Sequence, residues 1–262
     1  MSDSHRARKR FGQNFLHDPA VIGNIVAAIN PRQGQHLVEI GPGQGAITEG
    51  LVDSGCQLDV IELDRDLVPL LEAKFSGRDN IRIHQADALR FDFSSLAGDL
   101  PMRLVGNLPY NISTPLIFHL LDFAPLIHDM HFMLQLEVVN RMAASPGSKA
   151  WGRLGAMTQY HCQVDSLFEV APGSFKPAPK VTSAIVRLCP HKDHVIDPAQ
   201  EKRLRQVVTA AFSQRRKTLR NTLRDLVNVQ QLEDLDISPS ARAETLNLEQ
   251  FIAISELLTN SD

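Results

Sequence analysis

Short apolar runs alternate with segments of helical periodicity along the first half of this chain, and the alternation limits the folds it can adopt. Strands that alternate with helices pair in parallel, and right-handed crossovers place the helices on both faces of the sheet. The pattern therefore predicts an α/β fold with a doubly wound sheet. The expected strands span residues 36–41, 57–64, 81–87, 102–107 and 129–135, and the expected helices span residues 46–55, 67–75, 113–123 and 136–144.

The pattern changes after residue 150. Two apolar runs, at residues 162–170 and 180–188, flank a Pro-rich stretch and are expected to finish the sheet as an antiparallel edge. Three segments of helical periodicity follow, at residues 199–214, 215–227 and 247–258. We therefore expect a boundary near residue 190, which separates a larger domain (1–190) from a small all-helical C-terminal domain (191–262).

The composition is that of a globular protein: 43% of the 262 residues are hydrophobic and 22% are charged. No apolar run is long enough to span a bilayer, and the basic N-terminal segment lacks the apolar core of a signal peptide. Cys56, Cys162 and Cys189 lie far apart and are odd in number, which favours a reducing cytoplasm over a disulfide or zinc framework. Other metal ligands do not flank His191 and His194, so we expect no metal site.

The net charge of -3 conceals a local pattern. Residues 199–226 carry eight Lys and Arg against two acids, whereas residues 227–262 carry one Arg against seven acids. A second basic cluster lies in the N-terminal arm, at Arg6, Arg8, Lys9 and Arg10. Such clusters bind phosphate groups or are solvated helix faces, and the charge pattern alone favours solvated faces.

Three glycines, Gly41, Gly43 and Gly45, follow the first expected strand. Glycines at a strand-to-helix turn let the backbone turn tightly and approach a ligand closely. Glu62 ends the second strand, where an acid binds both hydroxyls of an adenosine ribose, and Asp87 ends the third, where a carboxylate accepts from an adenine amine. Two alternatives stay open. In the first, the acids only cap the following helices. In the second, the loop binds a dinucleotide, although the spacing of the third glycine matches the dinucleotide fingerprint G-x-G-x-x-G less well.

The fourth strand ends in Asn107, Leu108, Pro109 and Tyr110, beside the same crevice. The Asn107 side chain and the Leu108 backbone each offer a carbonyl. Pro109 fixes the local backbone, and Tyr110 supplies a flat face. Two acceptors hold the amino group of a planar base, and an aromatic ring stacks on that base. In isolation these residues are equally compatible with an ordinary turn.

Such a clamp suits methyl transfer to an exocyclic amine. This amine is a poor nucleophile because its lone pair is delocalised into the ring, and acceptors on its N–H groups return electron density to nitrogen. No strong base is needed, since the proton becomes acidic only as the N–C bond forms. Catalysis is then mainly positioning and electrostatics. An adenine amine carries two hydrogens, which permits two transfers.

The glycine loop, preceded by Glu39, resembles the first motif of class I S-adenosylmethionine-dependent methyltransferases, (D/E)-x-G-x-G-x-G. That resemblance implies a Rossmann-like sheet and S-adenosyl-L-methionine as cofactor. Asn-Leu-Pro-Tyr resembles, more narrowly, the motif of the ribosomal RNA adenine N6-dimethyltransferases, and in particular their bacterial KsgA branch. Nearly the whole chain shares in the resemblance, through family motifs at residues 8–16, 39–48, 175–188 and 213–221.

The resemblance implies roles for individual residues. The implied cofactor residues are Asn14, Leu16, Gly41, Gly43, Glu62, Asp87 and Asn107. Asn107 also belongs to the implied catalytic set with Leu108, Pro109, Tyr110 and Phe175. Phe175 would stack on the second face of the base, although without the resemblance it is better explained as a hydrophobic plug. The residues implied to hold RNA phosphates around an unstacked adenine are Arg8, Lys9, Arg10, Arg215, Arg216, Lys217 and Arg220.

The implied activity is that of a cytoplasmic 16S rRNA (adenine-N6,N6)-dimethyltransferase. Such an enzyme transfers four methyl groups to two adjacent adenosines in the hairpin loop near the 3′ end of 16S rRNA, and its partner would be the precursor small ribosomal subunit in 30S biogenesis. We expect a monomer. Two alternatives stay open: the related resistance enzymes that methylate one adenosine of 23S rRNA, and a nucleic-acid-binding assembly or transcription factor that keeps the fold without the activity. The motifs at residues 8–16 and 213–221 favour the 16S enzyme, and the intact glycine loop argues against the inactive factor.

Overall fold

The computed structural model describes residues 13–192 and 197–260 and divides the chain into two compact units. The first unit comprises the described residues up to Val139 together with Asp165–Pro190. The second comprises Asn140–Val164 together with the described residues from His191 onward. None of the helices formed by the described residues is long and apolar enough to cross a membrane.

The second unit differs from the domain expected from the sequence because it includes residues 140–164. Trp151 supplies the physical reason. Its side chain is fully buried, and its indole Nε1 donates to the Leu246 carbonyl oxygen at 2.9 Å, which ties this segment to the C-terminal helices. The functional roles assigned to the two domains stay predictions.

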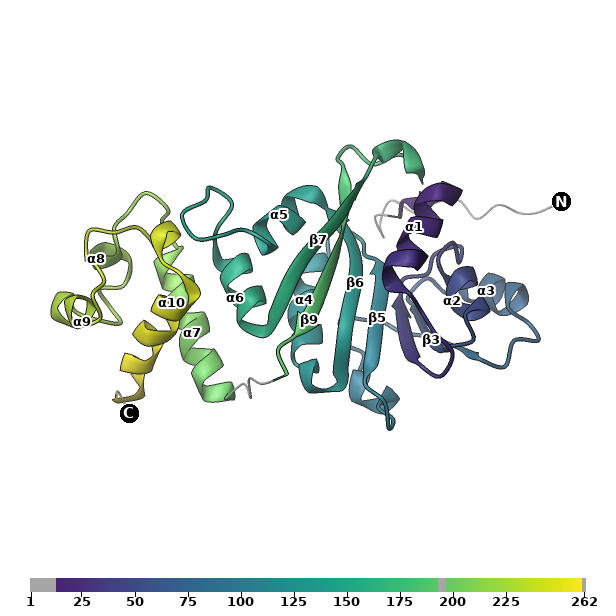
Figure 1. Ribbon diagram of the computed structural model, residues 1–262, viewed down its shortest axis with the longest axis horizontal. Coiled ribbons are helices and arrows are strands. Elements are labelled where there is room, and N and C mark those ends of the chain that lie inside the picture. The colour runs from purple at the N-terminus through teal and green to yellow at the C-terminus, as the bar shows by residue number, and fades with distance from the viewer. Residues whose placement is uncertain (1–12, 193–196, 261–262) are drawn as a thin grey trace. The chain divides into compact units, whose positions relative to one another are not determined.

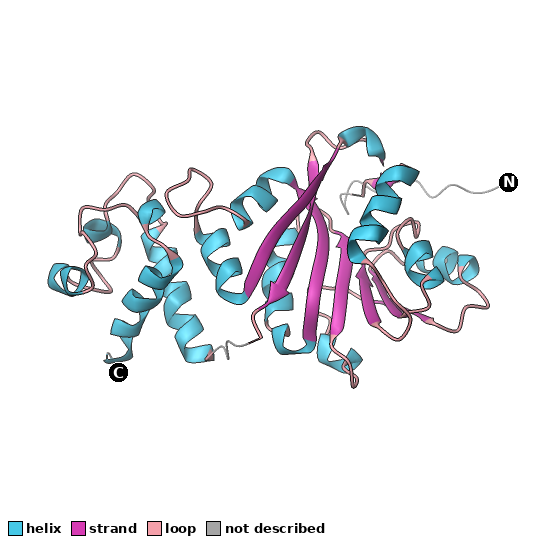
Figure 2. Ribbon diagram, in the orientation of Figure 1, coloured by secondary structure: helices cyan, strands magenta, loops and turns pink. Residues whose placement is uncertain are grey.

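The first unit is built around one large sheet, whose strands are shown as magenta arrows in Figure 2. Its strands are β2 (His36–Ile40), β3 (Gln57–Glu62), β4 (Ile81–Gln85), β5 (Met102–Asn107), β6 (Ile127–Gln135), β7 (Cys162–Val170, which belongs to this unit from Asp165 onward) and β9 (Ser183–Pro190). Their order is β4-β3-β2-β5-β6-β9-β7. Strands β2 to β6 pair in parallel, and β9 pairs antiparallel with β6. The predicted doubly wound sheet and its antiparallel edge are therefore confirmed.

Helices cover this sheet, as Figure 1 shows. The helices are α1 (Pro19–Ile29), α2 (Thr48–Asp53), α3 (Val68–Lys74), α4 (Ser113–Leu121) and α5 (Leu136–Met142), with short 3-10 helices at Phe93–Leu96, Ala124–Leu126 and Pro172–Ser174. Ile25, Leu51 and Leu71 from α1, α2 and α3 join the core cluster that contains Leu37 of β2. Val38, the next residue of β2, points to the opposite face and is also completely buried, so both faces of the strand are covered.

Two local details differ from the sequence analysis. Helix α1 was not predicted, although Asp18 caps it by accepting from the backbone amides of Ala20 and Val21. Helix α4 is not capped by its own first residues as expected. The Ser113 hydroxyl instead donates to the Tyr110 carbonyl oxygen at 3.2 Å, and no side chain caps the helix.

Between residues 197 and 260, the second unit consists of helices and the loops that connect them. Its helices are α6 (Arg153–His161), α7 (Pro198–Ala211), α8 (Leu219–Thr222), α9 (Val229–Asp234) and α10 (Leu248–Glu256), with 3-10 helices at Ala243–Thr245 and Leu257–Asn260. The helices predicted at residues 199–214 and 247–258 are confirmed as α7 and α10. The prediction of a helix over residues 215–227 is wrong, since only the short α8 forms there. The backbone amides of Leu219 and Arg220 donate instead to the distant carbonyl oxygens of Ala241 and Pro239.

Candidate active site

The sheet of the first unit has a topological switch point between β2 and β5. From β2 the chain runs outward through β3 and β4, and β5 then pairs with the other side of β2. The two strands approach very closely there, since a Cβ added to Gly106 would lie 2.5 Å from the Ile40 carbonyl oxygen. Ligands of such sheets bind in the crevice beyond the carboxyl ends of the strands at this point.

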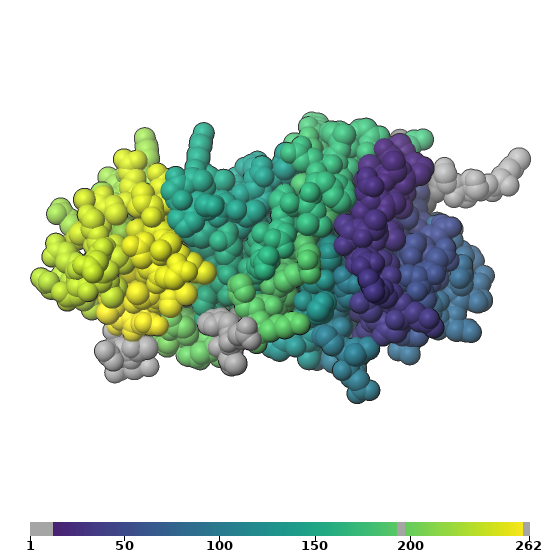
Figure 3. Space-filling model, in the orientation of Figure 1, coloured from purple at the N-terminus to yellow at the C-terminus, as the bar shows by residue number. Residues whose placement is uncertain are grey.

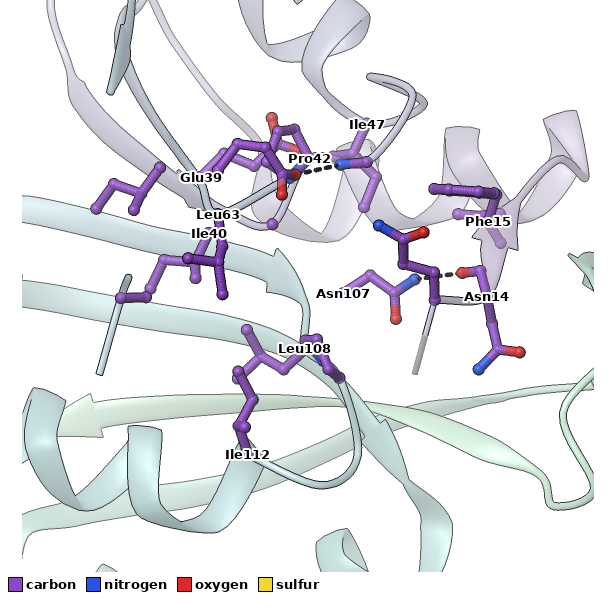
Figure 4. A pocket seen from close by; sticks show the side chains of 18 of the residues that line it. Asn14, Phe15, Glu39, Ile40, Pro42, Ile47, Leu63, Asn107, Leu108 and Ile112 are labelled. Atoms are coloured by element: carbon purple, nitrogen blue, oxygen red, sulfur yellow. Dashed lines mark hydrogen bonds between the residues drawn. The ribbon is translucent and has the colours of Figure 1, made fainter. Parts of the chain in front are cut away.

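A cavity of ≈ 310 Å³ occupies this crevice, and Figure 4 shows part of its lining. All seven residues predicted to bind a cofactor line it, and so do Leu108, Pro109 and Tyr110. Phe15, Leu63 and Ile112 add apolar walls that the sequence analysis did not identify. The structure thus brings together side chains from four strand ends, while the role of each residue stays a prediction.

The glycine loop after β2 has a backbone that only glycine adopts readily. Gly41, Gly43 and Gly45 have φ angles of 68°, 59° and 75°, in the left-handed region. A Cβ on Gly43 would also come within 3.1 Å of the Phe15 ring. The backbone N–H of Gly43 donates to Glu62 Oε2 at 3.3 Å, so the loop and the second strand end are held together.

Glu62 at the end of β3 and Asp87 just after β4 accept hydrogen bonds from backbone amides and also line the cavity. Glu62 Oε1 accepts from the Asp64 amide at 2.8 Å, and Asp87 Oδ1 accepts from the Leu89 amide at 3.0 Å. Burial raises the pKa of Glu62 above its ordinary value. Neither acid caps the helix that follows it, since no side chain caps α3 and Asp92 caps the 3-10 helix at Phe93–Leu96. Both carboxylates line the cavity.

Glu39 is a buried carboxyl group at the base of the cavity. Its side chain is 1% exposed, and the Thr48 hydroxyl donates to its Oε2 at 2.6 Å. Desolvation by burial raises the pKa of Glu39 from 4.5 to about 7, while the Thr48 hydrogen bond acts in the opposite direction. Near neutral pH this group therefore exists in both protonation states.

The Asn107 amide is held in one orientation by the N-terminal segment. Its Nδ2 donates to the Asn14 carbonyl oxygen at 3.1 Å, a bond drawn as a dashed line in Figure 4. Since this bond identifies the nitrogen of the Asn107 amide, the other atom of the amide, Oδ1, is oriented as a hydrogen-bond acceptor. The neighbouring Leu108 is held through its backbone N–H, which donates to the Met133 carbonyl oxygen at 3.3 Å.

The Tyr110 hydroxyl has a partner that the sequence analysis missed. It lies 2.7 Å from the Ser183 hydroxyl oxygen on β9, within hydrogen-bonding distance. Ser183 is completely buried and is not among the residues that line the cavity. A polar residue at the start of an apolar strand was the only available signal in the sequence.

Residues 13–17 form a strap along the edge of the cavity. Gln13 Nε2 donates to Asp64 Oδ2 at 3.1 Å, and the His17 amide donates to the Ser174 carbonyl oxygen at 3.0 Å. Between these bonds, β1 (Phe15–Leu16) pairs antiparallel with β8 (Phe175–Lys176). Figure 3 shows the N-terminal segment in purple against the green segment that follows β7.

Phe175 is 3% exposed and packs in the same core cluster as Leu16 and Val170. Unlike Tyr110, it is not among the residues that line the cavity. Its implied place on the second face of a bound base therefore stays a prediction.

Comparison with known proteins identifies the family. The sequence profile described as "Ribosomal RNA adenine dimethylase" matches residues 4–260. The chain belongs to this family. As a member it is a methyltransferase that acts on adenine in ribosomal RNA, which excludes the dinucleotide-binding alternative and confirms the enzyme class expected from the motifs.

Relatives of this dimethylase are similar over almost their whole length. A protein of Pseudomonas aeruginosa named "Ribosomal RNA small subunit methyltransferase A" is 59% identical over 256 residues, which cover 97% of this chain and 95% of the relative. A protein of Marinobacter nauticus with the same name is 58% identical over 257 residues, which cover 98% and 93%.

Two crystal structures share the fold. A dimethyladenosine transferase from Plasmodium falciparum is 26% identical with a TM-score of 0.81, and the match covers 92% of this chain and 95% of that one. The 23S rRNA methyltransferase ErmE is 28% identical with a TM-score of 0.74, and the match covers 94% and 99%. The fold is therefore that of a Rossmann-like ribosomal RNA methyltransferase.

The basic residues predicted to contact RNA are only partly described. Arg8, Lys9 and Arg10 lie outside the described residues, as does Arg6. Arg216, Lys217 and Arg220 are exposed, and the first two lie in the turn between α7 and α8 rather than on a helix. Arg215 is exposed too, but its Nη2 donates to the Lys149 carbonyl oxygen at 2.6 Å, so it holds a neighbouring loop of the second unit.

No group of three or more His, Cys, Asp or Glu side chains that could hold a metal ion occurs within residues 13–192 and 197–258. His194 lies outside the described residues. His191 Nε2 lies 3.0 Å from the Gln159 carbonyl oxygen, within hydrogen-bonding distance.

Proposed function

We propose that this dimethylase transfers four methyl groups from S-adenosyl-L-methionine to two adjacent adenosines in the hairpin loop near the 3′ end of 16S rRNA. Its substrate is the precursor small ribosomal subunit, and its place is the cytoplasm during 30S biogenesis. The similarity to relatives named for the small subunit, at 58–59% identity along the whole chain, supports this substrate over 23S rRNA. ErmE, which is named for 23S rRNA, is 28% identical.

One observation carries the mechanism: the Asn107 amide is oriented by the Asn14 carbonyl within the cavity that Glu62 and Asp87 also line. A target amine needs acceptors, and an amide whose nitrogen is already bonded presents its oxygen. The acceptor for the target and the polar groups for the cofactor then face the same space.

The residues of the cavity suit S-adenosyl-L-methionine. Carboxylates at two strand ends match ribose hydroxyls and an adenine amine, and the left-handed glycine loop lets the backbone approach closely. Leu63 and Phe15 provide apolar surface for a flat ring. The volume of ≈ 310 Å³ lies at the lower end of the range of about 300–1,000 Å³ for small-molecule sites. When bound, the cofactor supplies an activated methyl group on a sulfonium ion.

The protein's own contribution to the reaction is positioning. Asn107 Oδ1 and the Leu108 carbonyl accept the two amine N–H groups, which raises the electron density on nitrogen and directs its lone pair. The Tyr110 ring stacks on the base, an interaction typically worth about 1–3 kcal/mol. Pro109 lacks an N–H and so leaves the acceptors uncontested. No residue is assigned as a strong base, since the proton is lost only as the new N–C bond forms.

The exposed residues Arg216, Lys217 and Arg220, together with the basic N-terminal arm, are proposed to bind phosphates around the target loop. A loop presents an unstacked adenine at lower cost than a duplex does, so it suits an enzyme that must reach the exocyclic amine. We propose that the enzyme acts as a monomer.

Ribosomal RNA from cells that lack this protein tests the assignment. We expect two adjacent adenosines near the 3′ end of 16S rRNA to be unmodified there and to regain N6,N6-dimethylation when the gene is restored. Dimethyladenosines that persist in the deletion strain, or a missing methyl group on 23S rRNA instead, would refute it.

A further inference from the structure

A hydrogen bond between Tyr110 and Ser183 joins a ring that lines the cavity to β9, the strand that lies between β6 and β7. Their hydroxyl oxygens are 2.7 Å apart although the residues are 73 positions apart in the sequence. Ser183 opens β9 and is paired in register with Gln135 of β6. The ring of Tyr110 is thus tied, through its hydroxyl, to a strand in the interior of the sheet.

Tyr110 needs such a tie because its backbone belongs to a loop. It lies between the end of β5 and the start of α4, and its side chain is half-buried. The Ser113 hydroxyl holds the Tyr110 carbonyl at 3.2 Å, which fixes the backbone end of the residue. The bond to Ser183 fixes the opposite end, so rotation of the ring about its side-chain torsions is restricted.

Burial makes the tie strong and specific. Ser183 is 0% exposed, so water does not compete for its hydroxyl, and removal of either hydroxyl leaves the other without this partner. Ser183 does not line the cavity and so does not touch the substrate. Any effect it has on the reaction passes through Tyr110.

We propose that Ser183 is a positioning residue that fixes the plane of the Tyr110 ring, and that the second methyl transfer depends on it more than the first. The inference rests on the proposed dimethylation. In each transfer the amine nitrogen bonds to the methyl carbon as the S–CH3 bond breaks. The electron pair stays on sulfur as a thioether, and one amine proton passes to water.

The two transfers differ in what holds the base. The unmodified amine has two N–H groups for Asn107 Oδ1 and the Leu108 carbonyl, whereas the monomethylated amine has one. With one hydrogen bond lost, stacking on Tyr110 carries a larger share of the orientation. A ring free to tilt therefore impairs the second transfer more than the first.

The test measures both transfers under single-turnover conditions on undermethylated 30S subunits, with mono- and dimethyladenosine quantified by mass spectrometry. Ser183→Ala and Tyr110→Phe remove the same bond from its two ends, and Tyr110→Phe keeps the ring without changing a buried strand residue. We expect each to slow the second transfer about fivefold and the first at most about twofold, so that monomethyladenosine accumulates. Ser54→Ala, which removes a hydrogen-bonded hydroxyl at the end of α2 away from the cavity, should behave as wild type.

The double variant decides the mechanism. If the hydroxyls act only through each other, Ser183→Ala/Tyr110→Phe is no slower than either single variant. Additive losses, or equal slowing of both transfers, would overturn the proposal, as would an unchanged ratio of mono- to dimethyladenosine. If Ser183→Ala fails to fold, Tyr110→Phe alone carries the product-ratio test. A wild-type enzyme that makes no dimethyladenosine would refute the proposed function instead, so the two failures are distinguishable.

Discussion

Replacing Glu39 by glutamine should remove a pH dependence from the stability of the first unit. Glu39 is buried, and its pKa is raised from 4.5 in the unfolded chain to about 7 in the folded protein, mainly by desolvation. The folded state therefore binds the proton more tightly than the unfolded state does. The stabilisation from this group is complete at low pH, falls as the pH rises above 4.5, and is fully lost above about 7.

The size of the effect follows from the shift. A difference between 4.5 and about 7 corresponds to roughly 3 kcal/mol of unfolding free energy between pH 4.5 and pH 8, at about 1.4 kcal/mol per pKa unit. Glutamine has nearly the same shape as the protonated carboxyl and does not titrate, and its side-chain carbonyl can accept from Thr48. We expect Glu39→Gln to be more stable than wild type by an amount that grows over this range.

Urea unfolding followed by circular dichroism, at half-unit steps of pH, measures this difference. Glu49→Gln, an exposed carboxylate on the neighbouring helix α2, is the matched control and should follow wild type. Thr48→Val removes the hydrogen bond that lowers the pKa of Glu39, so the fall in stability should extend to higher pH. Parallel curves for wild type and Glu39→Gln would show that the pKa of Glu39 is the same in the folded and unfolded states and would refute the reasoning.

Two further predictions concern catalysis and RNA binding. Asn107→Ala should keep cofactor binding measurable by calorimetry but slow methyl transfer by about a hundredfold or more, because it removes the oriented acceptor of the amine; full activity on 30S subunits would contradict this role. Arg216→Ala/Lys217→Ala should reduce the slope of log binding constant against log salt by about 2, while Arg82→Ala/Lys192→Ala, which removes the same charge from exposed positions elsewhere, should not. An unchanged slope for Arg216→Ala/Lys217→Ala would show that these two residues are solvated and do not contact RNA phosphates.

The alternation of strands and helices predicted the sheet of this dimethylase well because each element carries its own pattern. The expected strand at residues 102–107 is β5 without any change of boundary. The cavity followed from topology, since parallel strands that alternate with helices bring Glu62, Asp87 and Asn107 to one edge of the sheet.

Features that depend on distant contacts could not be predicted in this way. Helical periodicity at residues 215–227 suggested a continuous helix, but hydrogen bonds to Pro239 and Ala241 limit it to α8. The partner of Tyr110 was hidden for the same reason, because nothing near it in the sequence points to Ser183. Helix α1 is a different case, since Asp18 and Pro19 are an ordinary start signal that the sequence analysis did not use.

The most direct measurement of the central claim is a count of methyl groups transferred by the purified protein. The enzyme would be incubated with S-adenosylmethionine carrying a labelled methyl group and with small ribosomal subunits from cells that lack the modification. Labelled positions would then be mapped by nuclease digestion and mass spectrometry. We predict four methyl groups per subunit, carried by two adjacent N6,N6-dimethyladenosines near the 3′ end of 16S rRNA. Label on 23S rRNA when large subunits are supplied, or no transfer to the small subunit, would contradict the account.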